Sequence, residues 1–254
     1  ALSGRLKMLD NPAAENIIRE AINRNENWIK YSLADMCYYA TKLFGTSDVS
    51  LIEGIRMKTY PGRMSEQEKH LCWNYDAFKL WDRTDEEFRI LDVGCGTFPY
   101  LDKFAQTNAG KVKQYIGIDK SDMAMFSGAH KTDKLGFDVI FHKVNICGNS
   151  HKLEEIIETP NVLFFGESFH CLCNPLNIVQ RLLDRFPEVY KIAILEHQSD
   201  EQQGLFMGFN FHMRMHGGTC VVNEEYISSV AAVLGWRMFV RDASSQHKMF
   251  VLVK

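Results

Sequence analysis

The sequence lacks several features that would assign it to a special class of protein. Its 254 residues carry 29 basic and 32 acidic side chains, and the net charge of −3 predicts no broad attraction to phosphate backbones or anionic membranes. No apolar run approaches the length of a membrane span, and the N-terminus lacks the apolar core of a signal peptide. We therefore expect a cytoplasmic protein that has no membrane partner and for which nucleic acid is disfavoured.

The cysteines do not follow the pattern of a disulfide framework. There are seven, an odd number, scattered from Cys37 to Cys220, which is typical of reduced thiols in an intracellular protein. Repeats and low-complexity tracts are missing, so no internal stretch is expected to be disordered. The length fits one α/β domain with an appendage. The first residue, Ala1, fits a processed chain or a piece of a longer one.

Two regions of the chain differ in hydrophobic pattern. Residues 1–84 are predicted to form a helical N-terminal extension. Its last helix would begin at a capping box formed by Ser65 and Glu68. It would carry several large side chains, namely Leu71, Trp73, Tyr75, Phe78 and Trp81. Rings at this density are more typical of packing than of a substrate pocket, although some could line one.

Residues 85–254 alternate short apolar runs with helical patterns, which predicts βαβ units and a parallel sheet. Five of the runs are expected to be parallel strands: Phe88–Val93, Gln114–Ile118, Phe137–Val144, Val162–Phe165 and Lys191–Leu195. Residues 242–247 leave no room for a helix, so the last two candidates should pair as an antiparallel hairpin, Trp236–Arg241 with Lys248–Val253. This layout differs from that of a dinucleotide-binding Rossmann domain.

The loop after the first predicted strand carries the strongest functional signal. The strand ends near Asp92, a Gly-Cys-Gly turn follows at residues 94–96, and a helical pattern opens after Pro99. Glycine lets the backbone approach a ligand closely. A dinucleotide fold needs a third glycine where this chain has Pro99, which argues against NAD or FAD. The Asp92 carboxylate suits a cationic group such as an ammonium, directly or through water.

Asp92, Gly94, Cys95 and Gly96 resemble the first motif, E/DxGxG, of the class I methyltransferases that depend on S-adenosylmethionine (SAM). The resemblance extends from about residue 88 to the C-terminus. It implies SAM as the cofactor, bound by these residues. It also implies a Rossmann-like α/β fold with a mostly parallel seven-stranded sheet and an antiparallel C-terminal hairpin. The N-terminal helices would then cap the acceptor pocket or form the surface of a homodimer.

A second motif of the family is matched by residues 115–119. The resemblance implies that Asp119 accepts hydrogen bonds from both ribose hydroxyls. An acid at this strand end suits any ribose, that of nicotinamide cofactors included. Lys120 follows and is assigned to the same site. Met123 would pack on adenine or, equally, within its own helix.

The third motif departs from the usual family pattern. The family places an acid after the third strand, and this chain has Asn145. The amide oxygen of Asn145 can still accept a hydrogen bond from the adenine amino group. Ile146, beside it, and Glu167, after the fourth strand, complete the residues assigned to the cofactor.

The end of the fourth predicted strand, residues 165–170, should face the methyl acceptor, because ligands of open α/β sheets bind beyond the carboxyl ends of the strands. The D/N-P-P-Y/F segment that DNA amino-methyltransferases carry here is missing. Glu196-His197 stands where a cap 2′-O-methyltransferase needs a lysine. Both nucleic-acid classes are therefore disfavoured, and a small-molecule acceptor is the expected partner.

His170 is the first catalytic candidate. Residues 169–175 look similar to a segment of small-molecule O-methyltransferases in which a histidine acts as a base or orients the acceptor. A neutral imidazole can take the proton of a hydroxyl, although a histidine here can also pack near adenine without moving a proton. His197 and His212 are further catalytic candidates. His212 and His216 could share a helix face, but no third ligand is evident, so no metal site is predicted.

The predicted function is methyl transfer from SAM to an oxygen or nitrogen of a small molecule by direct in-line attack. Two alternatives stay open. One is an RNA-cap or protein methyltransferase, including a domain of a larger chain, for which a basic surface beside the pocket would argue. The other is a non-catalytic subunit with the same fold, for which a blocked acceptor pocket would argue.

Overall fold

The computed structural model describes residues 73–81, 85–120, 135–148, 150–197, 222–244 and 247–254. The chain divides into two compact units, Ala1–Leu71 and Cys72–Lys254, and every described residue belongs to the second. Residues 73–81, which the hydrophobic pattern grouped with the N-terminal region, therefore belong to the second unit. The predicted N-terminal helices, and the candidate residues Met123, His212 and His216, lie outside the described residues.

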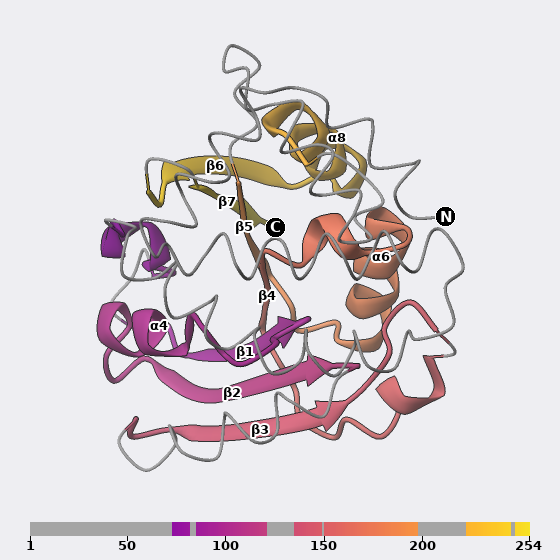
Figure 1. Cartoon of the computed structure of the whole chain (residues 1–254), viewed down its shortest axis with the longest axis horizontal. Coiled ribbons are helices and arrows are strands. Elements are labelled where there is room, and N and C mark those ends of the chain that lie inside the picture. Colours follow the sequence, from indigo (N-terminus) through magenta and orange to yellow (C-terminus); the bar gives the residue numbers. More distant parts are fainter. Residues whose placement is uncertain (1–72, 82–84, 121–134, 149, 198–221, 245–246) are drawn as a thin grey trace, which may run out of the picture. The chain divides into compact units, whose positions relative to one another are not determined.

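A seven-stranded sheet runs through the second unit in the order β3-β2-β1-β4-β5-β7-β6 (Figure 1). The first five strands are parallel, and β7 is antiparallel to both of its neighbours, β5 and β6. The strands are β1 Phe88–Val93, β2 Val112–Asp119, β3 Asp138–Lys143, β4 Val162–Gly166, β5 Lys191–His197, β6 Arg237–Asp242 and β7 His247–Val253. The predicted fold class, a mostly parallel seven-stranded sheet with an antiparallel C-terminal hairpin, is confirmed.

Helices cover both faces of this sheet (Figure 1). Residues Ile90 and Phe164 pack toward α4 (Leu101–Thr107) and the short 3₁₀ helix η2 (Tyr75–Phe78). Their neighbours along the strands point to the other face and pack toward helices α6 and α8, which span Pro175–Arg185 and Glu224–Leu234. A parallel sheet that is buried on both faces needs apolar residues at consecutive positions. This requirement explains the continuous apolar runs of β1 and β4.

The helix ends follow from particular residues. Asn174 caps α6 through a hydrogen bond that its side chain accepts from the Asn177 amide at 3.3 Å. Asn223 caps α8 in the same way, at 2.8 Å from the Tyr226 amide. Gly235 ends α8 with a φ of 70°, a left-handed conformation that glycine adopts without strain.

The prediction of an aromatic-rich helix that continues through Trp81 is wrong for residues 73–81. They form only η2, which is flanked by extended residues at Asn74 and Lys79. The aromatic rings pack on tertiary neighbours instead: the Trp73 and Phe78 rings lie 5.9 and 6.1 Å from the Tyr100 ring. Packing against α4 and its preceding loop has therefore overridden the local helical pattern.

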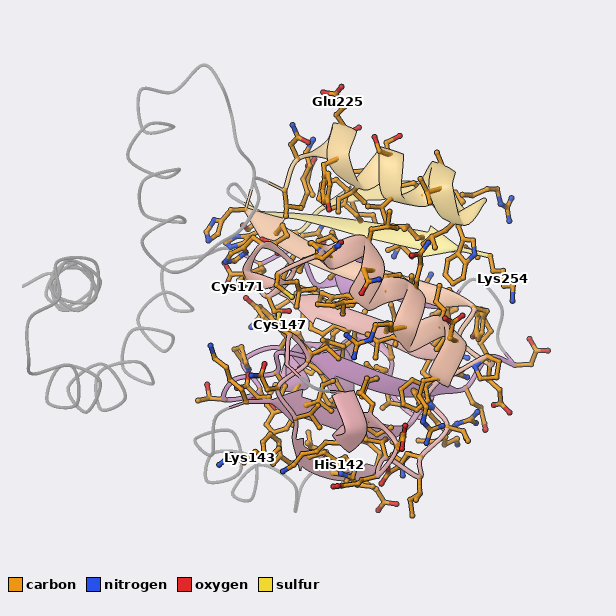
Figure 2. All side chains as sticks on the ribbon, turned by 90° about the vertical axis from the view of Figure 1, so that its right-hand side faces the viewer. His142, Lys143, Cys147, Cys171, Glu225 and Lys254 are labelled. Carbon is orange, nitrogen blue, oxygen red and sulfur yellow. The ribbon has the colours of Figure 1, made fainter. Side chains whose placement is uncertain are left out.

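The strand order reverses between β1 and β4, because β2 and β3 lie on one side of this pair and β5 on the other. Ligands of open α/β sheets bind at such a switch point, beyond the carboxyl ends of the strands. Figure 2 shows Lys143, Cys147 and Cys171 along this edge and Lys254 at the opposite edge. None of the helices in the described ranges is both long and apolar enough to cross a membrane.

Candidate functional site

The glycine loop at the end of β1 is held closely against its neighbours. Gly94 and Gly96 have φ values of 75° and 49°, in the left-handed region that favours glycine. The amides of Gly94 and Cys95 both donate to the Ile118 carbonyl, at 2.8 and 3.2 Å. A Cβ on Gly94 would lie 2.7 Å from the Cβ of Ser168. Both the dihedral angle and the space therefore require glycine at position 94.

The glycine of the second motif, Gly117, has a separate steric reason. A Cβ there would lie 2.3 Å from the Phe98 ring and 2.8 Å from the Cys95 Sγ. Phe98 itself has a φ of 55°, which is uncommon for a residue with a side chain. Its buried ring also contacts the rings of Tyr115 and Phe141. Because Gly117 of β2 has no side chain, the ring of Phe98 from the loop after β1 can pack directly against the β2 backbone.

Asp119 links the first two motifs. It lies at the carboxyl end of β2, and its Oδ2 accepts a hydrogen bond from the Gly96 amide at 3.1 Å. Lys120 follows and is exposed. The structure therefore brings together the glycine loop and the carboxylate that were predicted to bind one ligand. This contact does not itself test the ribose role, which stays a prediction.

Asp92 lies inside the protein, with 1% of its surface exposed. Its Oδ2 accepts a hydrogen bond from the Tyr115 hydroxyl at 2.8 Å. Burial is the main cause that raises the pKa of Asp92; the Tyr115 hydrogen bond opposes it, the nearby charge of Asp119 adds to it, and the net pKa is about 8. Much of the Asp92 population is therefore protonated at neutral pH. Its predicted contact with a ligand ammonium stays a prediction.

Three other predicted cofactor residues differ in their surroundings. Burial raises the pKa of the Cys95 thiol well above its usual value, so this thiol is neutral and unreactive. Asn145 is exposed after β3, and its side chain lies over Gly148, where a Cβ would be 3.1 Å from Nδ2. Ile146 is mostly buried in the core on the α6 side. All three follow the carboxyl ends of β1 and β3.

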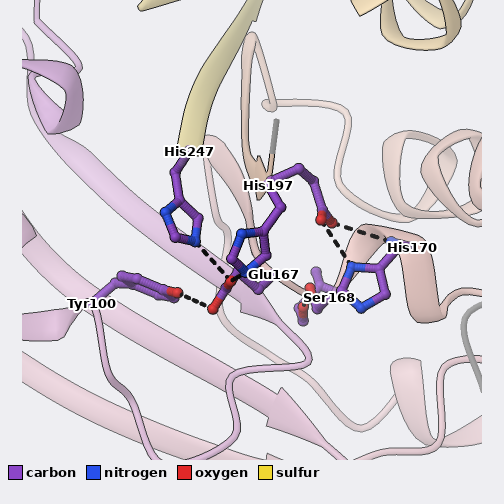
Figure 3. Close-up of polar contacts among 8 residues, drawn as sticks. Tyr100, Glu167, Ser168, His170, His197 and His247 are labelled. Carbon is purple, nitrogen blue, oxygen red and sulfur yellow. Dashed lines mark hydrogen bonds and ion pairs between the residues drawn. The ribbon is translucent and has the colours of Figure 1, made fainter. Parts of the chain in front are cut away.

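Glu167 is the centre of a polar cluster on the other side of the switch point (Figure 3). Its Oε1 lies 2.6 Å from His197 Nε2 and 2.9 Å from His247 Nε2. Its Oε2 accepts a hydrogen bond from the Tyr100 hydroxyl at 2.6 Å. Glu167 was predicted to bind the cofactor and His197 to act in catalysis, and the structure brings these two side chains into direct contact.

The charges in this cluster are distributed unequally. Burial alone would raise the pKa of Glu167, but the His197 imidazolium and the hydrogen bonds from both histidines lower it well below its usual range. Burial lowers the pKa of His197, yet the Glu167 carboxylate outweighs burial and raises it. Burial dominates at His247 and lowers its pKa. The Glu167 carboxylate thus favours the protonated form of His197, whereas the neutral form of His247 is favoured.

His247 is the main residue that the sequence analysis missed. Strands β5 and β7 pair in a register that sets it opposite His197, and the ring centroids lie 4.0 Å apart. Ser244 Oγ lies 2.8 Å from its Nδ1, and the Trp73 ring is 4.9 Å from its own ring. The hairpin was predicted, but the pairing of β7 with β5 was not. Had the antiparallel pairing of β7 with β5 been predicted, His247 at the start of β7 would have been placed at the carboxyl edge of the sheet.

His170, in the short 3₁₀ helix η5 (Phe169–Cys171), forms a buried pair with Glu196. Its Nδ1 lies 2.8 Å from Glu196 Oε2, and its backbone amide donates to Oε1 at 3.2 Å. Burial lowers the pKa of His170, but the charge and hydrogen bond of Glu196, together with the adjacent Cys171 side chain, outweigh burial and raise the pKa to about 11. His170 is therefore protonated at neutral pH. An imidazolium can orient a ligand or stabilise negative charge, but it cannot accept a proton.

No protein-family model and no curated protein matches the sequence. Solved structures do match. An O-methyltransferase family protein from Burkholderia thailandensis has a TM-score of 0.65 and 13% identity, over 90% of this chain and 71% of that one. The trans-methyltransferase CalH in complex with SAH has a TM-score of 0.59 and 17% identity, over 99% and 76%. A SAM-dependent methyltransferase from Aquifex aeolicus has a TM-score of 0.50 and 20% identity, over 71% and 89%. At these identities the likeness defines the fold, and the chain has the Rossmann-like fold of SAM-dependent methyltransferases.

Proposed function

We propose that the chain is a SAM-dependent methyltransferase that acts on an oxygen or nitrogen of a small molecule. The contact between Asp119 and the glycine loop carries this proposal. The Gly96 amide donates to Asp119 Oδ2 at 3.1 Å, so a carboxylate and a close-packed glycine turn meet at the switch point of the sheet. A carboxylate there suits the hydroxyls of a ribose, and the missing third glycine disfavours a pyrophosphate.

The residues present fit this cofactor. The left-handed turn at Gly94 and Gly96 lets a ligand approach the backbone, Asp119 would hold the ribose, and the Asn145 amide would hold the adenine amino group. SAM, when bound, supplies the electrophilic methyl group. The chain's own residues align the acceptor and exclude water.

The acceptor side comprises the ends of β4 and β5 and the start of β7. Glu167 and His197 are 16% and 17% exposed, so they reach solvent, whereas His170 and Glu196 are more deeply buried, at 8% and 2%. The His170 imidazolium and the Glu167 carboxylate are suited to hydrogen-bond a polar acceptor. Among the named structural neighbours are two further O-methyltransferases, a mitomycin 7-O-methyltransferase and one in complex with apigenin, which supports a small polar acceptor.

Ligand binding to the full chain tests this function before an acceptor is known. Titration calorimetry should detect SAM and SAH but not NAD. The Asp119→Ala variant should lose about 2–4 kcal/mol of SAM affinity, because two charge-assisted hydrogen bonds are removed. Asp138 is an exposed aspartate at the start of β3, away from the carboxyl edge of the sheet, so Asp138→Ala is the matched control and should bind SAM as the parent does. Binding of NAD without SAM would refute the proposal, and unchanged SAM affinity in folded Asp119→Ala would refute the assigned role of Asp119.

A further inference from the structure

We propose that Glu167, His197 and His247 form a binding site for a divalent transition-metal ion such as Zn²⁺. The three ligand atoms, one carboxylate oxygen and two ring nitrogens, all lie within 4.8 Å of one another. Two histidines and one carboxylate are a donor set that binds zinc and related ions. Metal binding at these residues is independent of SAM, so this inference does not rest on the proposed function.

The distances suit an ion. Both Nε2 atoms point at the same carboxylate oxygen, Glu167 Oε1, at 2.6 and 2.9 Å (Figure 3). Bonds of about 2.1 Å in a tetrahedral site separate neighbouring donor atoms by about 3.4 Å. The side chains would therefore need to separate by less than about 1 Å to admit the ion between them. Shifts of this size lie within the range of side-chain rotations.

The surroundings of the three residues are those of a built site. Each sits at the end of a strand of one sheet, and the β5–β7 register fixes His197 opposite His247. Ser244 Oγ, 2.8 Å from His247 Nδ1, orients that ring through its second nitrogen. The Tyr100 hydroxyl orients the carboxylate through Oε2. Metal-binding histidines and carboxylates are usually held by outer hydrogen bonds of this kind.

The protons balance when the ion binds. The proton of the His197 imidazolium leaves to solvent. The neutral His247 now donates from Nε2 to Glu167, so its proton moves to Nδ1, where the Ser244 oxygen accepts it. Three protein ligands leave a fourth position for water or for an oxygen of a ligand, as in catalytic zinc sites.

The chain contains a matched comparison. His142 Nε2 and Glu158 Oε2 lie 3.0 Å apart, which is another histidine–glutamate pair but without a second histidine. Within the described ranges, Glu167, His197 and His247 form the one group of three side chains whose ligand atoms converge in this way. If any histidine–glutamate pair could bind the metal, substitution of His142 would weaken metal binding as much as substitution of His197.

The experiment uses the chelator-treated full chain without SAM. Calorimetry with ZnCl₂ should give one site, and Co²⁺ should give the visible absorption of a tetrahedral ion. His197→Gln and His247→Gln should each weaken Zn²⁺ binding by about 10-fold or more, whereas His142→Gln should bind as the parent does. Circular dichroism verifies that each variant is folded. If His247→Gln does not fold, the result for His197→Gln alone tests the proposal, because His197 is partly exposed and its substitution should not disrupt the fold.

Three results would overturn the proposal. The folded parent takes up no Zn²⁺, or His197→Gln binds it as tightly as the parent, or Co²⁺ gives a thiolate charge-transfer band. The last result would assign the ion to cysteines instead; among the described residues, Cys147, Cys171 and Cys173 are exposed free cysteines at the same edge. Zinc binding without SAM binding would refute the proposed function and leave the metal site standing.

Discussion

Replacing Asp92 by asparagine should abolish a decline in stability between pH 4 and pH 8. Asp92 has a pKa of about 8 in the folded protein, because it is buried, and of about 3.9 in the unfolded chain. Between these values the folded protein holds a proton that the unfolded chain has released. The free energy of unfolding therefore falls as the pH rises. The contribution is fully present below about pH 4 and is lost above about pH 8.

The difference of about four pKa units corresponds to about 5 kcal/mol at most, and we expect a decline of a few kcal/mol across this range. The asparagine side chain of the Asp92→Asn variant carries no charge at any pH, and its amide oxygen can still accept the hydrogen bond from Tyr115. Below about pH 4 the variant and parent should therefore be similar in stability. At pH 8.5 the variant should be more stable by a few kcal/mol.

Urea unfolding at several pH values, followed by tryptophan fluorescence, measures this difference. Asp138→Asn, at an exposed aspartate, should reproduce the pH profile of the parent. If the parent and Asp92→Asn lose stability equally between pH 5 and 8.5, Asp92 is not a protonated group in the folded protein. A variant that is less stable than the parent at pH 8.5 would refute the argument altogether, because the buried carboxylate would then be stabilising.

Two other substitutions test local geometry and charge. Gly117→Ala should destabilise the protein by about 1–3 kcal/mol in chemical unfolding, because the new methyl overlaps the buried Phe98 ring. Gly110→Ala, which meets nothing within 4 Å, carries only the cost of its left-handed backbone and should lose less; equal losses would contradict the steric argument. Glu196→Gln should lower the pKa of His170 from about 11, because the largest charge that raises it is gone while burial and the Cys171 side chain remain. An NMR titration of the His170 ring measures this change, and an unchanged pKa would exclude Glu196 as the cause.

Local patterns predicted the sheet because the central strands, such as β1, β4 and β5, are short runs of mostly apolar residues. Strand β1 occupies the predicted residues 88–93, and β4 and β5 begin at the predicted residues. The glycine motif and Asp119 were found for a related reason: the loop chemistry is local to a strand end. That they meet through the Gly96 amide follows from the parallel pairing of β1 with β2, which brings their carboxyl ends together.

Features that depend on distant pairing could not be read from local patterns. Residues 73–81 have the apolar spacing of a helix, yet contacts with Tyr100 and Phe104 decide their conformation. The charge on His170 depends on Glu196, which lies on a different strand. His247 meets Glu167 only because β7 enters the sheet beside β5. In each case the decisive partner is far away in the sequence.

The charges at the carboxyl edge constrain how an acceptor can lose its proton. His170 is already protonated at neutral pH, and the adjacent Glu167 carboxylate raises the pKa of His197 and so favours its protonated form. The Glu167 carboxylate has a low pKa and is engaged by three donors, so it is a weak base. His247 has a lowered pKa, but its side chain is buried and its Nε2 faces Glu167. These groups therefore favour an acceptor that ionises without a protein base. A metal ion held by Glu167, His197 and His247 would supply that ionisation, since a coordinated hydroxyl loses its proton far more readily than a free one. One measurement therefore tests both proposals. If methyl transfer to a hydroxyl is found, its rate should fall in His197→Gln together with the affinity for Zn²⁺. Added Zn²⁺ should restore the activity of the chelator-treated parent but not that of the variant.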